Sequence, residues 1–198
     1  AAVVARFRRE FGDGLRAWTT SHDWRKGDVG FAEHTRRQIY EIGVTGIITW
    51  AATKRLSDWE RYTGRPANPQ CAILIKDDGT TQVQSGYYFY KQFTWAGQPG
   101  MSVAAVDDRA AGGLTAAAFG SNGTRHPAAF VVINPKSEGR VVRIVLAGGD
   151  SQEFQAFRTC DGLAEGEAFK NIGIHSADAT GAMLYHAPAK SATTFLAK

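Results

Sequence analysis

Residues 44–50 form a nearly continuous apolar run that is typical of a parallel β-strand covered on both faces. A shorter, threonine-containing segment over residues 15–21 predicts a second strand. Between the two, apolar side chains recur at helical spacing, which predicts a helix that starts at Gly27-Asp28 and ends at Gly43. Strand–helix–strand order of this kind indicates material from a β/α barrel or a doubly wound sheet.

Two parallel strands cannot make a stable sheet by themselves. Each would keep one edge without a hydrogen-bond partner, and a barrel cannot close with so few strands. The remainder of the first hundred residues predicts helices over 1–11 and 87–96, a loop over 57–70, and a hairpin over 72–83 that turns at Asp77-Asp78-Gly79. We therefore expect further polypeptide on the amino-terminal side to supply the missing strands.

The pattern changes near residue 100. Beyond it, short apolar segments are separated by clusters of turn-forming residues, which predicts an antiparallel β-sandwich. The expected domains are accordingly residues 1–100, the α/β part, and residues 101–198, the sandwich. The predicted sandwich strands are residues 102–106, 114–119, 128–134, 140–147, 153–159 and 191–196.

Composition argues against several classes of function. The formal charge is +4, but the basic residues are scattered, so nucleic-acid binding is not expected. Cys71 and Cys160 do not make a disulfide framework, although a single bridge stays open in an oxidising compartment. With five dispersed histidines they lack zinc-site spacing, so neither a metal nor another cofactor is expected. No apolar run reaches the roughly 18–20 residues that a membrane-spanning helix needs.

Several segments carry a resemblance to a known family. An aromatic-rich stretch over residues 87–100 ends in Gly97-Gln98-Pro99-Gly100, and short motifs follow it at intervals in the sandwich. In order, the segments resemble the seventh and eighth barrel strands, the last barrel helix and the sandwich strands of glycoside hydrolase family 30, a family of retaining clan A glycosidases. The matching segments are residues 15–21, 44–50, 87–100, 118–119, 131–134, 157–159 and 187–195.

The resemblance covers nearly the whole chain and implies a fold and a function. The fold would be the last two β/α units of a TIM (β/α)8 barrel, over residues 1–100, followed by an antiparallel β-sandwich. The chain would be the carboxy-terminal chain of a glycoside hydrolase acting on a β-linked polysaccharide, oligosaccharide or glycoside. An amino-terminal chain with the other barrel strands would carry the acid/base, and the location would be secreted or periplasmic.

The family mechanism requires a second carboxylate, and here the sequence departs from the pattern. The resemblance implies a nucleophilic glutamate at the end of the seventh strand, which attacks the anomeric carbon, and that position is Ser21 in this chain. A serine hydroxyl without a strong base is a poor anomeric nucleophile. Three alternatives stay open: Ser21 replaces the glutamate by engineering or natural loss, Asp23 supplies the carboxylate in a shifted register, or the chain uses Ser21-His22-Asp23 differently.

Residues 21–25 place side chains that can hydrogen bond or stack at the end of this strand, where barrel enzymes have their active sites. His22 and Arg25 suit sugar hydroxyls, and Trp24 could stack on a pyranose ring; the alternative is a polar loop with Trp24 packed beneath it. A Ser-His-Asp triad is not expected, because adjacent side chains point in different directions.

The two strands carry further candidates for sugar binding. Trp50 ends the second strand, where it would either form the floor of a sugar-binding site or pack in the core as an ordinary tryptophan. Lys54 and Trp59 follow in the loop after this strand. Trp18 on the first strand is a candidate of the same kind. The alternative function for the chain is a non-catalytic carbohydrate-binding or structural sandwich protein, which the serine at position 21 favours.

Overall fold

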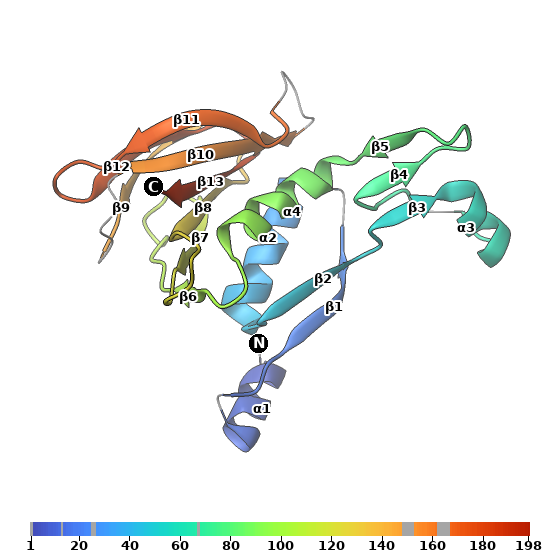
Figure 1. Ribbon diagram of the computed structural model, residues 1–198, viewed down its shortest axis with the longest axis horizontal. Helices are drawn as coiled ribbons and strands as arrows, with labels where there is room; N and C mark the ends of the chain where they lie inside the picture. The colour runs from blue at the N-terminus through green and yellow to red at the C-terminus, as the bar shows by residue number, and fades with distance from the viewer. Residues whose placement is uncertain (1, 13, 25–26, 67, 148–152, 162–166) are drawn as a thin grey trace. The chain divides into compact units, whose positions relative to one another are not determined.

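The computed structural model describes residues 2–12, 14–24, 27–66, 68–147, 153–161 and 167–198 (Figure 1). The chain divides into two compact units, Ala1–Tyr87 and Tyr88–Lys198. The units separate near the start of helix α4 (Ser85–Ala96), whereas the boundary expected from the sequence follows residue 100. No helix among the described residues is long and apolar enough to cross a membrane.

A parallel pair of strands forms the centre of the first unit. Strand β1 (Trp18–Asp23) lies beside strand β2 (Gly46–Trp50), and the connection between them is helix α2 (Val29–Arg37) with the π-helical turn η1 (Gln38–Ile42) (Figure 1). Helix α1 (Ala2–Phe11) precedes β1. The predicted strand–helix–strand order is therefore confirmed. Because β1 and β2 are parallel, their carboxyl ends lie at the same edge.

Local chemistry sets both ends of the connecting helix. The Asp28 side chain accepts a hydrogen bond from the backbone N–H of Gly30, which satisfies a donor that the first helical turn leaves open. At the other end Gly43 has a φ of 80°, a left-handed conformation that glycine adopts without strain, and its N–H bonds to the Gln38 carbonyl. The start and the end predicted for this helix are both correct.

A small insertion follows β2. It consists of β3 (Thr53–Arg55), helix α3 (Leu56–Thr63) and the hairpin β4 (Ile73–Ile75) and β5 (Thr81–Val83). The hairpin is confirmed, but the loop predicted from residue 57 is wrong over its first half, where α3 lies. The turn-forming residues on which that prediction rested begin only at Gly64, which ends α3 in a left-handed conformation.

The second unit is an antiparallel sandwich. Its larger sheet has the strand order β11-β10-β13-β8-β7-β6, and its smaller sheet pairs β12 with β9. Side chains of both sheets form one core, including Phe130, Phe195 and Met183. The strands are β6 (Ser102–Ala104), β7 (Thr115–Gly120), β8 (Ala129–Asn134), β9 (Arg140–Val145), β10 (Glu153–Cys160), β11 (Lys170–Ser176), β12 (Ala182–Ala187) and β13 (Ser191–Ala197).

All six predicted sandwich strands are present, and the described part of the sandwich contains two more that were not predicted. Strand β11 alternates poorly, because Gly173 interrupts it and its register against β10 shifts between Ala156 and Phe157. Strand β12 is the short segment Ala182–Ala187, which has an alanine at each end and no β-branched residue, so its strand signal is weak.

Helix α4 packs against the larger sheet through a buried polar contact. The Gln92 side chain donates to Thr159 Oγ1 at 2.8 Å, and Thr194 Oγ1 donates to Gln92 Oε1 at 2.6 Å. Phe89 and Phe93, on the same helix, are buried. These two rings of the aromatic-rich segment are therefore part of the core.

Candidate functional site

The β1–β2 pair has one covered face and one open face. On the covered face, Thr19 Oγ1 donates to Gln38 Oε1 at 2.8 Å, and His22 lies against α2. The other side is solvent-exposed and is called the open face below. Its members are Trp18, Thr20, Ser21, Asp23, Ile48 and Trp50.

His22 fastens the end of β1 to α2. Its side chain is 1% exposed, and its Nε2 lies 3.1 Å from Thr35 Oγ1. The Thr35 hydroxyl donates its own hydrogen to the Phe31 carbonyl at 2.9 Å, so Nε2 of His22 is the donor in this pair. The ring also stacks on His34, with centroids 4.5 Å apart. The structure thus places this predicted sugar-binding residue in the interior.

A β-bulge lies directly before His22. Thr19 is opposite Ile47 while His22 is opposite Thr49, so β1 holds one more residue than β2 over this interval. Because His22 points inward, its neighbours Ser21 and Asp23 both point to the open face. Asp23 is opposite Trp50 at the carboxyl edge of the pair. The structure therefore brings together three of the predicted site residues.

Two tryptophans give the open face its aromatic character. Trp18 is 60% exposed and Trp50 is 56% exposed. Trp18 lies across Gly46, where a Cβ atom would come within 2.8 Å of the indole ring. The peptide bond after Trp50 is cis. Exposed indoles beside a carboxylate and a hydroxyl can stack on a sugar ring and hydrogen bond to its hydroxyls.

Trp24 is not part of this surface. Its side chain is 2% exposed, its Nε1 donates to the Ala51 carbonyl at 2.9 Å, and its ring stacks on Phe31. This arrangement corresponds to the packed alternative for Trp24. Arg25, the neighbouring candidate, lies outside the described residues.

Lys54 and Trp59 form a cluster of their own in the insertion. Lys54 Nζ lies 5.5 Å from the centroid of the Trp59 ring and donates to the Asn68 carbonyl at 3.0 Å. Trp59 is on α3 and is partly exposed. Among the residues that the structure describes, their contacts are therefore with each other and with the insertion, not with the open face.

A cavity of about 290 Å³ lies beside the buried Trp24, between Gly27, Cys71 and Ser85, and no sequence pattern predicted it. Burial raises the pKa of the Cys71 thiol, so the group is protonated near neutral pH and is a weak nucleophile. Cys71 and Cys160 are both free cysteines. Among the described residues, no group of three or more His, Cys, Asp or Glu side chains could hold a metal ion.

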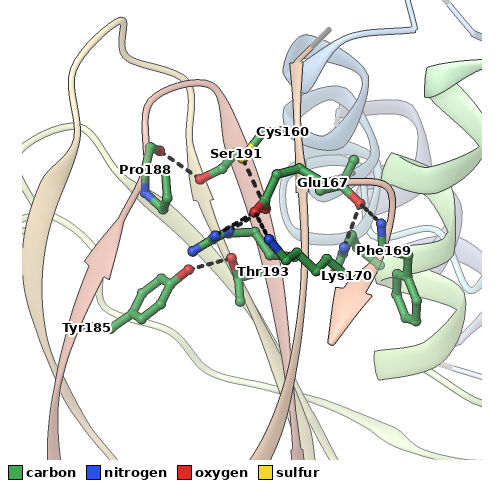
Figure 2. A network of polar contacts seen from close by, with 11 residues as sticks. Cys160, Glu167, Phe169, Lys170, Tyr185, Pro188, Ser191 and Thr193 are labelled. Atoms are coloured by element: carbon green, nitrogen blue, oxygen red, sulfur yellow. Dashed lines mark hydrogen bonds and ion pairs between the residues drawn. The ribbon is translucent and has the colours of Figure 1, made fainter. Parts of the chain in front are cut away.

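Sequence reasoning also missed an ion network in the sandwich (Figure 2). Glu167 accepts two hydrogen bonds from Arg158, at 2.6 and 2.8 Å, and lies 3.2 Å from Lys170 Nζ. The hydrogen bonds from Arg158 lower the pKa of Glu167 to about 2, and burial beside Glu167 raises the pKa of the Cys160 thiol to about 11. Both oxygens of the Glu167 carboxylate are engaged by Arg158 and Lys170, which indicates a structural role for the network.

Comparison with known proteins finds similarity of structure but not of sequence. No protein-family model matches the sequence, and no curated protein matches it. A family 30 endoxylanase from Clostridium papyrosolvens C71 has a similar structure over 98% of this chain, with a TM-score of 0.72 and 15% identity. A family 30 subfamily 8 xylanase from Clostridium acetobutylicum matches 93% of the chain, with a TM-score of 0.73 and 16% identity.

A third similar structure is a conserved exported protein from Bacteroides fragilis, with a TM-score of 0.68 and 14% identity over 98% of this chain. The chain spans 44%, 43% and 42% of the lengths of these three proteins. The chain therefore has the fold of the carboxy-terminal part of a family 30-like glycoside hydrolase.

Proposed function

We propose that this chain is the carboxy-terminal part of a glycoside hydrolase that cleaves a β-linked polysaccharide, oligosaccharide or glycoside. In this proposal β1 and β2 are the last two strands of a (β/α)8 barrel, and the open face is part of the barrel's interior. The observation that carries the proposal is the grouping of Ser21, Asp23 and Trp50 at the carboxyl edge of the pair, where barrel enzymes bind their substrates.

The open face supports a barrel that is completed by other strands. In the described part of the chain, β1 and β2 pair with each other and with no further strand, so each keeps a free edge. On α1, Val3, Phe7 and Phe11 form an exposed apolar side. An amino-terminal part, in the same polypeptide or in a second chain, would cover these surfaces and supply the catalytic acid/base. Secretion or export to the periplasm fits a polysaccharide substrate and agrees with the structural similarity to an exported protein from Bacteroides fragilis.

Each residue of the open face has a role in this proposal. The Trp50 indole forms the floor on which a sugar ring stacks, and Trp18 lines the barrel interior below it. Ser21 takes the position of the family's nucleophile, and Asp23 provides the carboxylate that the chain has at this edge. His22 and Trp24 act from the interior, because their packing on α2 and on Ala51 fixes the end of β1. Lys54 and Trp59 are candidates for contacts with more distant sugar units.

Ser21 favours a second candidate function, a carbohydrate-binding protein without hydrolytic activity. A neutral hydroxyl cannot replace a carboxylate as the group that stabilises positive charge at the anomeric carbon. The open face would then retain its aromatic floor and bind sugars without cleaving them.

Turnover and binding measured together separate these functions. We expect the protein that contains the whole barrel to hydrolyse a member of a panel of β-linked polysaccharides and aryl β-glycosides. Trp50→Ala should weaken substrate binding about tenfold, the effect of losing roughly 1.4 kcal/mol of aromatic stacking. Trp95→Ala, at a tryptophan of similar exposure in the sandwich unit, is the matched control and should leave binding unchanged.

Binding without turnover would establish the second function instead. A protein that neither binds nor cleaves any member of the panel would overturn both proposals.

A further inference from the structure

We infer that Asp23 is a general base that activates a water molecule held at Ser21, so that cleavage inverts the configuration at the anomeric carbon. This inference rests on the proposed hydrolase function. It concerns the residue that replaces the missing nucleophile and the stereochemistry that follows, neither of which the likeness in fold determines.

The first step of the argument is the space at position 21. Ser21 is on the open face, at the position where the resembling family has its nucleophilic glutamate. Its side chain is two carbon atoms shorter than that of glutamate. A water molecule, which occupies about 30 Å³ in the liquid, fits into the room that a glutamate carboxylate would take. The Ser21 hydroxyl can hydrogen bond to that water as donor or acceptor.

The second step is the position of the carboxylate. Residues i and i+2 of a strand point to the same face and lie about 6.6 Å apart, so Asp23 follows Ser21 on the open face and reaches farther toward the carboxyl edge. The buried His22 between them is bonded to Thr35, which holds the backbone on both sides in this orientation. The β-bulge before His22 places both Thr19 and His22 on the covered face, which leaves Ser21 and Asp23 on the open face.

The third step compares this arrangement with the two classes of glycosidase. The catalytic carboxyl groups are roughly 5–5.5 Å apart in retaining enzymes and roughly 6.5–9.5 Å apart in inverting enzymes, where a water molecule lies between base and sugar. In this chain serine takes the place of the glutamate at position 21, and the carboxylate available is that of Asp23, one side chain farther along the same face. The expected separation of the two catalytic carboxyl groups therefore changes from that of retaining enzymes toward that of inverting enzymes. Asp23 is also opposite Trp50, the proposed sugar floor.

The step itself balances without an additional reactant. The carboxylate of Asp23 takes a proton from the water, whose oxygen forms a bond to the anomeric carbon while the glycosidic C–O bond breaks. A carboxylic acid on the remainder of the barrel donates a proton to the leaving oxygen. The products are an alcohol and a sugar with the opposite anomeric configuration, and the two carboxyl groups have exchanged protonation states.

The test is the anomeric configuration of the first product, followed by proton NMR during hydrolysis by the protein with the complete barrel. We expect inversion. Asp23→Asn should lower kcat by at least about a hundredfold, the usual contribution of a general base. Asp107→Asn is the matched control, because Asp107 is an exposed carboxylate of the other unit paired with Arg109, and it should leave kcat unchanged.

Ser21→Glu supplies a second measurement. A carboxylate at this position displaces the water and should change the product from inverted to retained configuration. Retention by the unmodified protein would overturn the inference and leave the hydrolase proposal intact. Turnover only after Ser21→Glu would overturn it as well and identify the natural chain as a binding protein, and an absence of turnover in both would overturn the inference together with the hydrolase proposal.

Discussion

At the scale of single residues, buried polar side chains fix the shape of both units. His22 and Thr35 form a buried hydrogen-bonded pair in the first unit, while Glu167 and Arg158 form an ionised pair in the second. The first pair contributes through its satisfied hydrogen bond, and removing one member leaves the other without this partner. The ionised pair contributes only while both groups are charged, so its effect depends on pH.

The first prediction concerns the stability of the sandwich unit as a function of pH. The pKa of Glu167 is lowered from 4.5 to about 2 in the folded chain, so its stabilising effect is complete above pH 4.5 and is lost as the pH falls toward 2. Glu167→Gln should lower the free energy of unfolding at pH 7 by about 2–3 kcal/mol. Urea denaturation at pH 7 and near pH 2 measures this difference.

Near pH 2 the loss caused by Glu167→Gln should be much smaller than at pH 7, because the carboxyl is then about half protonated in the folded chain and fully protonated in the unfolded chain. Glu138→Gln, at an exposed carboxylate paired with Arg140, is the control and should have little effect at either pH. A loss of the same size at both pH values would show that the charge of Glu167 does not matter.

The second prediction concerns the anchor of β1. Thr35→Val keeps the shape of the side chain but removes the acceptor of the His22 Nε2–H, so the free energy of unfolding of the first unit should fall by about 1–3 kcal/mol. Thermal denaturation followed by tryptophan fluorescence measures the change. The exposed Thr63, which donates to the Trp59 carbonyl, provides the control Thr63→Val. Equal stability of the two variants would contradict the role given to the anchor.

At the scale of secondary structure, sequence patterns predicted the elements that have a strong period or a marked end. The apolar run of β2, the helical spacing of α2 and the glycine at its end were sufficient to predict that part of the fold. Helix α3 was missed because the turn-forming residues that follow it dominate the pattern, and β11 was missed because a glycine and a shifted register break its alternation. Short elements whose stability comes from their neighbours leave a weak local signal.

The candidate site was predicted as a segment but not as a surface. The sequence placed residues 21–25 at the end of a strand, and that position is correct for the residues that the structure describes. It did not show that Ser21 and Asp23 face one side while His22 faces the other, because the bulge in β1 changes the alternation just before them. The burial of Trp24 likewise depends on Ala51 and Phe31, which are distant in sequence.

The third prediction concerns the attachment of α4 to the larger sheet. Gln92→Leu removes the hydrogen bonds to Thr159 and Thr194 and leaves both hydroxyls with fewer partners in the interior. The free energy of unfolding of the sandwich unit should fall by about 1–3 kcal/mol, and amide hydrogen exchange in α4 should become faster. Gln155→Leu, on the surface of β10, should change neither. Unchanged exchange in α4 of the Gln92 variant would contradict this role.

At the scale of the whole molecule, the two units differ in how completely they bury their own elements. The sandwich has a core shared by two sheets, whereas β1 and β2 present a face with exposed Trp18, Ile48 and Trp50. Exposed large apolar side chains gathered on one face of a sheet indicate a surface that another element covers. The similarity in fold to enzymes more than twice as long fits this interpretation, because those proteins have room for the remaining barrel strands.

The account depends most on the claim that further polypeptide completes the β1–β2 pair. The most direct test is the native mass of the protein isolated from its own cells by an antibody against this sequence. We expect the 21.4 kDa of sequence to occur within a longer polypeptide or in a stable complex with a second chain that supplies the other barrel strands. A stably folded, self-contained monomer of 21.4 kDa would contradict the account.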